Sequence, residues 1–146
     1  MKIKQLSTFI ENRPGQLLAP VKALADAGIS ILTLSLADTR EYGIVHLIVH
    51  NWQRAKEVLQ SKGLVANVTD VVAVEVDDKP GGLADMLGII EQGGVNIEYM
   101  YAFTAKQEGK GLMILRFDRP ETAIQALQQS GFNVLGTVEL FLRMTN

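Results

Sequence analysis

The sequence predicts an α+β fold in which one unit, with the order strand, helix, strand, strand, helix, strand, occurs twice in tandem. The prediction begins from two segments that repeat at one spacing. Residues 13–17 (RPGQL) return 66 positions later as residues 79–83 (KPGGL). Residues 27–31 (AGISI) return, again 66 positions later, as residues 93–97 (GGVNI). Two matches at the same spacing indicate that the whole unit is duplicated.

A third match shows where the two copies differ in length. Residues 43–47 (GIVHL) correspond to residues 111–115 (GLMIL), which lie 68 positions later. The two additional residues fall in the polar stretch 105–110, which is longer than its counterpart at residues 38–42. Because hairpin loops tolerate insertions, a difference confined to this stretch is consistent with duplication.

Each copy begins with a strand that leads into an amphipathic helix. In the first copy we expect a strand at residues 3–10 and a helix that begins at Pro14. Proline suits the first helical turn, and Gly28 suits the left-handed residue that ends a helix. The second copy repeats this pattern with Pro80 and a Gly-Gly ending at residues 93–94. The apolar residues at helical spacing in the first copy are Leu17, Leu18, Val21, Leu24 and Ala25.

The third strand of each copy has the clearest alternation of apolar residues. One parity places Val45, Leu47 and Val49 on a single face. The equivalent positions of the second copy are Met113, Leu115 and Phe117. We expect these to be the core faces of two four-stranded antiparallel sheets, each with both of its helices on one side.

The second strands differ between the copies. Leu32, Leu34 and Leu36 alternate in the first copy, whereas the aromatic residues of the second copy take the opposite parity. A change of parity exchanges the faces of a strand unless a β-bulge restores it. The aromatic side chains of the second copy therefore face either their own helices or a partner sheet, with core packing as the simpler interpretation.

The repeat defines two domains, residues 1–70 and residues 71–146. Residues 68–76 pass from the last strand of the first domain into the first strand of the second with hardly any linker. We therefore expect the two domains to be packed side by side.

Composition excludes several functional classes. The formal net charge of −2 is unlike the positive field that nucleic acids or anionic membranes attract. The chain has no cysteine, and its only two histidines, His46 and His50, would lie about 13 Å apart on one strand, too far to share a metal ion. Neither a nucleophile elbow nor a phosphate-binding loop is present. We expect no enzyme activity, no cofactor and no metal, and a cytoplasmic location without a signal peptide or membrane span.

The turn between the first strand and the first helix carries the most chemical information in each copy. A glycine at a helix start lets a ligand approach the backbone amides, and the helix dipole favours a carboxylate there. The side chains of Asn12 and Asp78 can accept hydrogen bonds from an ammonium group. The two turns would thus suit the backbone end of a free amino acid. The alternative is that Pro-Gly only shapes the turn, with Asn12 or Asp78 as a helix cap.

Both copies resemble the ACT domain, whose pattern is Asn/Asp-x-Pro-Gly-x-Leu, about a dozen helical residues, and then Gly-Val/Ile-Asn/Ser-Ile. The resemblance covers nearly the whole chain, and it implies two ferredoxin-like domains, amino-acid or other small-ligand binding, and a regulatory role. Copy one departs at Ser30, where asparagine is usual, and Gly82 is expected to loosen the second turn. The resemblance implies ligand contacts at both turns and at the start of each second strand: Asn12, Arg13, Pro14, Gly15, Gln16, Leu17, Ser30, Ile31, Asp78, Lys79, Pro80, Gly81, Gly82, Leu83, Asn96 and Ile97.

These observations favour a stand-alone regulatory protein that binds an amino acid or similar small ligand. We expect it to be a homodimer that acts as a metabolic sensor and transmits ligand occupancy to a metabolic enzyme. A second hypothesis is a ligand-free protein-interaction or regulatory subunit of such an enzyme. A third is an RNA-binding module, because the RNA recognition motif has the same element order and residues 110–117 (KGLMILRF) loosely match its signature. The stacking aromatic residues of that motif are missing at Leu112 and Ile114, and the chain is acidic.

Overall fold

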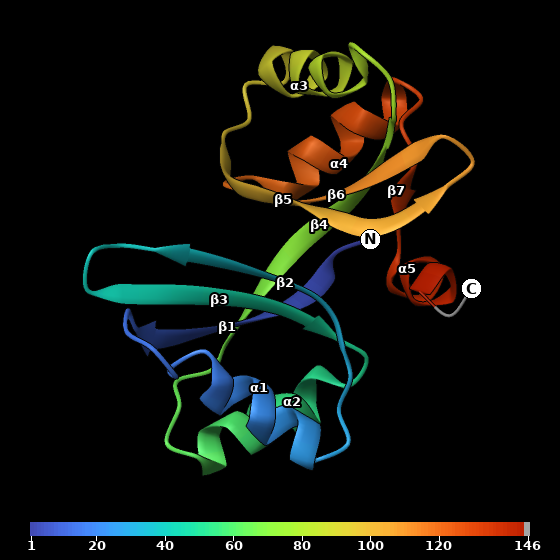
Figure 1. Ribbon diagram of the computed structural model, residues 1–146. Helices are drawn as coiled ribbons and strands as arrows, with labels where there is room; N and C mark the ends of the chain where they lie inside the picture. The colour runs from blue at the N-terminus through green and yellow to red at the C-terminus, as the bar shows by residue number, and fades with distance from the viewer. Residues whose placement is uncertain (145–146) are drawn as a thin grey trace. The chain divides into compact units, whose positions relative to one another are not determined.

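A computed structural model describes residues 1–144, with only the backbone described at residues 104–107 and 144 (Figure 1). The chain divides into two compact units. The first unit comprises Lys4–Thr69, and the second comprises Met1–Ile3 together with the chain from Asp70 onward. The short N-terminal segment therefore belongs to the second unit, where Lys2 forms ion pairs with Asp70 and Glu121.

Each unit is an antiparallel sheet covered by helices, so the predicted α+β class is confirmed. The elements of the first unit are β1 (Ile3–Glu11), α1 (Leu18–Asp26), β2 (Ile31–Asp38), β3 (Tyr42–Val49), α2 (Trp52–Ser61) and the beginning of β4 (Asn67–Asp77). Those of the second unit are the rest of β4, α3 (Gly82–Gln92), β5 (Ile97–Gln107), β6 (Lys110–Phe117), α4 (Pro120–Gln129), β7 (Val134–Leu135) and α5 (Thr137–Met144). The strand orders are β2-β3-β1 in the first unit and β5-β6-β4-β7 in the second.

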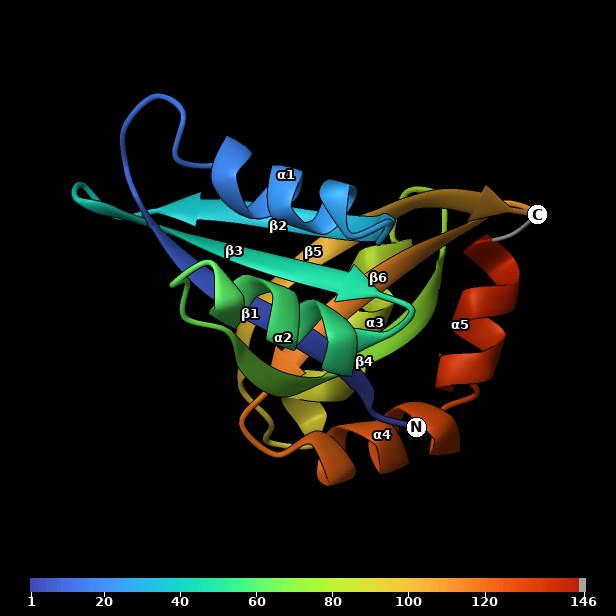
Figure 2. The same ribbon diagram turned by 90° about the horizontal axis from the view of Figure 1, so that it is seen from below.

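The core of each unit lies between its sheet and its two main helices. Figure 2 shows α1 and α2 together on one side of β1, β2 and β3. In the first unit Val45, Leu47 and Val49 pack with buried residues of both helices. In the second unit Leu115 and Phe117 are buried in the core, with Met113 packed against it. The core faces predicted for the third strands are thus confirmed.

The helices begin later than the sequence pattern predicts. α1 starts at Leu18 and α3 at Gly82, rather than at Pro14 and Pro80. The glycine after each proline has a positive φ, 84° at Gly15 and 89° at Gly81. A residue with this backbone conformation cannot belong to a right-handed helix, so each Pro-Gly pair precedes its helix.

The second strands contain a bulge near their start in both units. The register shifts between Ile31 and Thr33 in β2, and between Ile97 and Tyr99 in β5. Beyond the bulge, Leu34 and Leu36 of β2 pair with the core-face residues Leu47 and Val45 of β3.

The aromatic residues of β5 lie on the face of the sheet away from α3 and α4. Tyr101 pairs with Ile114 and Phe103 with Leu112, which have the parity opposite to the core-face residues of β6. The second strands of the two units therefore place their alternating residues on opposite faces, as the sequence indicates. Burial raises the pKa of the Tyr101 phenol, and the neighbouring Tyr99 adds to this shift.

The C-terminal part of the second unit differs from the predicted final strand. β7 has only two residues, and after Gly136 the chain forms the helix α5. The stretch 137–142 (TVELFL) alternates as a strand would, yet in the helix Leu140 is fully buried and Leu142 is 60% exposed. Arg143 in the last turn of α5 forms an ion pair with Glu75 of β4. This contact and the burial of Leu140 stabilise a helix that local alternation alone does not predict.

Candidate functional site

Both Pro-Gly segments form the same reverse turn. The amide of Gln16 donates to the carbonyl oxygen of Arg13 over 3.3 Å, and the amide of Gly82 donates to that of Lys79 over 3.0 Å. With proline at the second position and a left-handed glycine at the third, each segment is a type II turn. The duplication that the sequence indicates therefore extends to the hydrogen bond that closes each turn.

A pocket of about 440 Å³ lies against the turn of the first unit. Its lining combines the turn with the ends of β1 and β2 and the beginning of β3: Ile10, Glu11, Asn12, Arg13, Pro14, Gly15, Leu17, Leu18, Leu36, Asp38 and Gly43. Gln16, which the resemblance also implies, is outside this lining.

Polar contacts hold the first turn against the end of β2. The side-chain amide of Asn12 donates to Asp38 Oδ2 over 3.2 Å and to the carbonyl oxygen of Thr39 over 3.3 Å. Arg13 Nε lies 2.6 Å from Glu11 Oε2. Because the Asn12 amide nitrogen is used in these bonds, its side-chain oxygen is left as the acceptor that the predicted ammonium contact requires.

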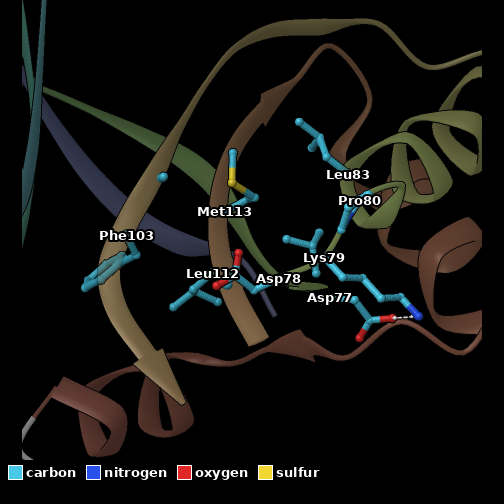
Figure 3. A pocket seen from close by; sticks show the side chains of 11 residues that line it. Asp77, Asp78, Lys79, Pro80, Leu83, Phe103, Leu112 and Met113 are labelled. Carbon is cyan, nitrogen blue, oxygen red and sulfur yellow. Dashed lines mark ion pairs between the residues drawn. The ribbon is translucent and has the colours of Figure 1, made fainter. Parts of the chain in front are cut away.

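The turn of the second unit lines an equivalent pocket of about 500 Å³ (Figure 3). Its lining is Val76, Asp77, Asp78, Lys79, Pro80, Leu83, Ala102, Phe103, Gly111, Leu112 and Met113. In Figure 3 Pro80 of the turn and Leu83 of α3 lie on one side of this pocket, and Met113 of β6 lies on the other. Of the predicted residues in this turn, Gly81 and Gly82 are outside the lining.

Asp77 is the electrostatic centre of the second turn. Its carboxylate accepts a hydrogen bond from Lys110 Nζ, and its Oδ2 lies 3.7 Å from Lys79 Nζ. The Lys110 contact, with a smaller contribution from Lys79, holds the pKa of Asp77 below its ordinary value. The turn thus has a fixed negative charge with two exposed ammonium groups beside it.

Gly82 tightens the second turn rather than loosening it. This residue is buried, and a Cβ added there would lie 2.0 Å from the carbonyl oxygen of Asp77. No side chain fits at that distance, so the close approach of α3 to the end of β4 requires glycine. The expectation of a looser turn is wrong for this steric reason.

Comparison with known families decides the classification. Residues 1–140 match the family model described as an ACT domain pair. The chain belongs to this family. The resemblance seen in the two turns therefore holds for nearly the whole chain, and each unit is built around one ACT domain.

Several solved structures have the same fold. Protein BT0572 from Bacteroides thetaiotaomicron is 32% identical, with a TM-score of 0.89 over 97% of this chain and 96% of that one. The ligand-free regulatory subunit of aspartate kinase from Thermus thermophilus is 23% identical, with a TM-score of 0.65 over 88% of this chain and 92% of that one. The regulatory subunit of aspartate kinase from Thermus flavus is 20% identical, with a TM-score of 0.62 over 86% of this chain and 90% of that one. The search of curated proteins returned no match.

The predicted positions at the start of the second strands lie away from the pocket of their own ACT domain. Ile31 begins β2, whereas Asp38 at its other end contacts the turn, and a strand of this length spans about 23 Å. Ser30 and Ile31 line neither turn pocket, and the same holds for Asn96 and Ile97. A ligand contact at these four residues stays a prediction.

The two histidines have different environments. His46 Nδ1 lies 2.8 Å from Ser7 Oγ and 3.1 Å from Gln5 Nε2, and burial lowers its pKa. His50 is exposed. Among residues 1–144, no cluster of histidine and carboxylate side chains has the arrangement of a metal site. No helix in that range is both long and apolar enough to cross a membrane.

Sequence reasoning missed the sheet residues that complete each pocket. Leu36 and Gly43 line the first pocket, and Gly111 and Met113 line the second. The repeat did contain a signal for two of them, because Gly43 and Gly111 are equivalent in the two copies. Glycine within a strand often marks a place where another group approaches the sheet.

Proposed function

We propose that this ACT domain pair is a regulatory protein, not an enzyme, that binds a free amino acid at the two type II turns. The observation that carries the proposal is the repetition of one arrangement, in which an Asn/Asp-x-Pro-Gly turn borders a pocket of about 440 or 500 Å³. Pockets of this size lie within the range of small-molecule sites. The ligand would prefer one conformation of the protein and so shift its population.

The chemistry of the turn supports an amino acid in particular. The amides of Leu83 and Ala84 lie in the first turn of α3, where backbone donors have no partner within the helix. These donors and the nearby Lys79 are suited to a carboxylate. The carboxylate of Asp78 and the side-chain oxygen of Asn12 are suited to an ammonium group.

A regulatory role in metabolism is supported by the fold shared with the aspartate kinase regulatory subunits. In this proposal, ligand binding changes the interaction of the chain with a metabolic enzyme. Self-association is part of the same proposal. β2 lies at the edge of its sheet and exposes Leu34 and Leu36, an arrangement that favours pairing with another copy. Light scattering of the purified protein would show a homodimer if this is correct.

A thermal-shift screen of the free amino acids at millimolar concentration tests the proposal. Ligand at 100 times its Kd adds about 2.7 kcal/mol to the free energy of unfolding, so a specific ligand gives a clear rise in Tm. The variants Asn12→Ala and Asp78→Ala should reduce this rise. The control Asp26→Ala, an exposed carboxylate on α1 that pairs with Lys22, should retain it. A flat response from every amino acid would contradict the proposal and favour a ligand-free interaction subunit.

A further inference from the structure

The second pocket has a polar end and an apolar floor. Its charged residues, Asp77, Asp78 and Lys79, follow one another from the end of β4 into the turn. The lining that comes from the strands and from the start of α3 is hydrocarbon or thioether, apart from glycine: Val76, Leu83, Ala102, Phe103, Leu112 and Met113. A ligand that fills this pocket must therefore be charged at one end and apolar at the other.

The depth of the floor depends on a glycine in β6. Gly111 pairs with Val76 of β4 and lines the pocket. A Cβ added at Gly111 would lie 3.6 Å from Val76 Cγ2, which is an ordinary van der Waals contact. A methyl group therefore fits there without displacing the backbone, and it would occupy space that is now part of the pocket.

The first pocket has a glycine at the same place in its third strand, with less room beside it. Gly43 of β3 is the equivalent glycine, and it lines the pocket with Ile10 and Leu36. A Cβ at Gly43 would lie 3.0 Å from Ile10 Cγ1 and 3.1 Å from Leu36 Cδ1. Ile10 and Leu36 would have to shift to admit a Cβ at Gly43, whereas Gly111 of the second unit has room for a methyl group.

We infer that the amino acid bound at these turns has an apolar side chain, and that Gly111 sets the size of side chain that the second pocket accepts. This inference rests on the proposed function and specifies its ligand. The backbone end of the ligand lies at the turn, and its side chain lies over Gly111 against Val76 and Met113. A polar side chain at that place loses its hydration without gaining a hydrogen bond from the floor, which disfavours it.

Titration calorimetry with pairs of amino acids of similar shape tests the apolar preference. We expect leucine to bind at least about tenfold more tightly than asparagine, and methionine at least about tenfold more tightly than glutamine. Each apolar member buries hydrocarbon or thioether groups where the polar member has an amide, and one buried methylene alone contributes about fourfold in affinity. Equal or stronger binding of the polar members would overturn the inference and leave the proposed function intact. If no amino acid binds at all, the inference and the proposed function are both wrong.

The variant Gly111→Ala tests the role of the glycine. It should weaken binding of leucine, methionine or phenylalanine at the second pocket by about tenfold and leave alanine nearly unaffected, because the added methyl competes only with long side chains. The amide signal of Gly81 in nuclear magnetic resonance spectra reports on the second turn, and that of Gly15 reports on the first.

The matched control is Gly88→Ala on α3, where a Cβ would meet nothing within 4 Å and which does not line the pocket. It should bind every amino acid as the parent does. Equal weakening of small and large amino acids by Gly111→Ala, with the melting temperature of the free protein unchanged, would contradict the size-limiting role.

Discussion

At the scale of single residues, the two turns depend on glycines that no other residue replaces without strain. Gly81 has a φ of 89° and precedes the first residue of α3. An L-residue in that conformation brings its Cβ close to a backbone oxygen. The proline before it limits the conformations of the turn, so the pair fixes the direction in which the helix leaves the sheet.

We predict that Gly81→Ala lowers the free energy of unfolding by about 1–2 kcal/mol, because alanine must adopt the left-handed conformation. Gly88→Ala in the same helix provides the opposite case. It should raise the free energy of unfolding by about 0.5–1 kcal/mol, since alanine has the higher helix propensity and no steric contact opposes it. Urea unfolding of both variants measures the two effects, and changes of the same sign would contradict this account.

His46 should give the stability of the protein a pH dependence. Burial lowers its pKa in the folded protein, so the unfolded chain takes up the proton first as the pH falls below about 6.5. The stabilising effect of the neutral ring is complete above that pH and is lost as the pH falls through the lowered pKa. The stability difference between the parent and His46→Gln should therefore be more favourable to the parent at pH 7.5 than at pH 5. If urea unfolding gives the same stability difference between the parent and His46→Gln at both pH values, His46 does not cause a pH dependence.

At the scale of elements, the sequence predicts the helices and strands of the duplicated frame but not their beginnings and ends. Hydrophobic periodicity located α1 and α3 because their apolar residues pack on the sheet. It predicts starts that are too early because the spacing of apolar residues carries no information on the backbone conformation of Gly15 and Gly81. The helix α5 was missed because its alternating apolar residues are as compatible with a strand, and long-range contacts decide between the two.

Two leucines of α5 allow a matched test of this helix. Leu140 is fully buried, so Leu140→Ala should lower the free energy of unfolding by about 2–5 kcal/mol. Leu142 is 60% exposed, and Leu142→Ala should change the free energy of unfolding by less than about 0.5 kcal/mol. If residues 137–142 formed a strand, both leucines would lie on the same face and the two variants would have similar effects. Similar losses in urea unfolding would thus contradict the helix.

At the scale of the whole molecule, the duplication is the feature that the sequence predicts most completely. The spacing of 66 residues relates two turns of the same type, each beside a pocket of similar size. The sheet residues of these pockets could not be predicted, because they come from strands that are distant in the sequence. Leu36 lies 20 residues after the last residue of the first turn, and Met113 lies 31 residues after the last residue of the second.

The two copies are not identical in their chemistry. Asp77 in the second turn contacts two lysines, whereas Glu11 in the first is paired with Arg13. α3 begins at the last residue of its type II turn, whereas α1 begins two residues after the last residue of its own turn. We therefore predict that the two pockets bind the same amino acid with different affinity. Calorimetric titration should require two dissociation constants, and a single constant with two equal sites would contradict this prediction.

The most direct test of the central claim is a crystal structure of the protein grown with the amino acid that raises its Tm most. We predict electron density for the ligand in at least one turn pocket, with its carboxylate and ammonium groups at residues 12–15 or 78–83 and its side chain over the strand glycine. Density bound elsewhere, with both turn pockets free of ligand at saturating concentration, would contradict the assignment of these turns as the binding site.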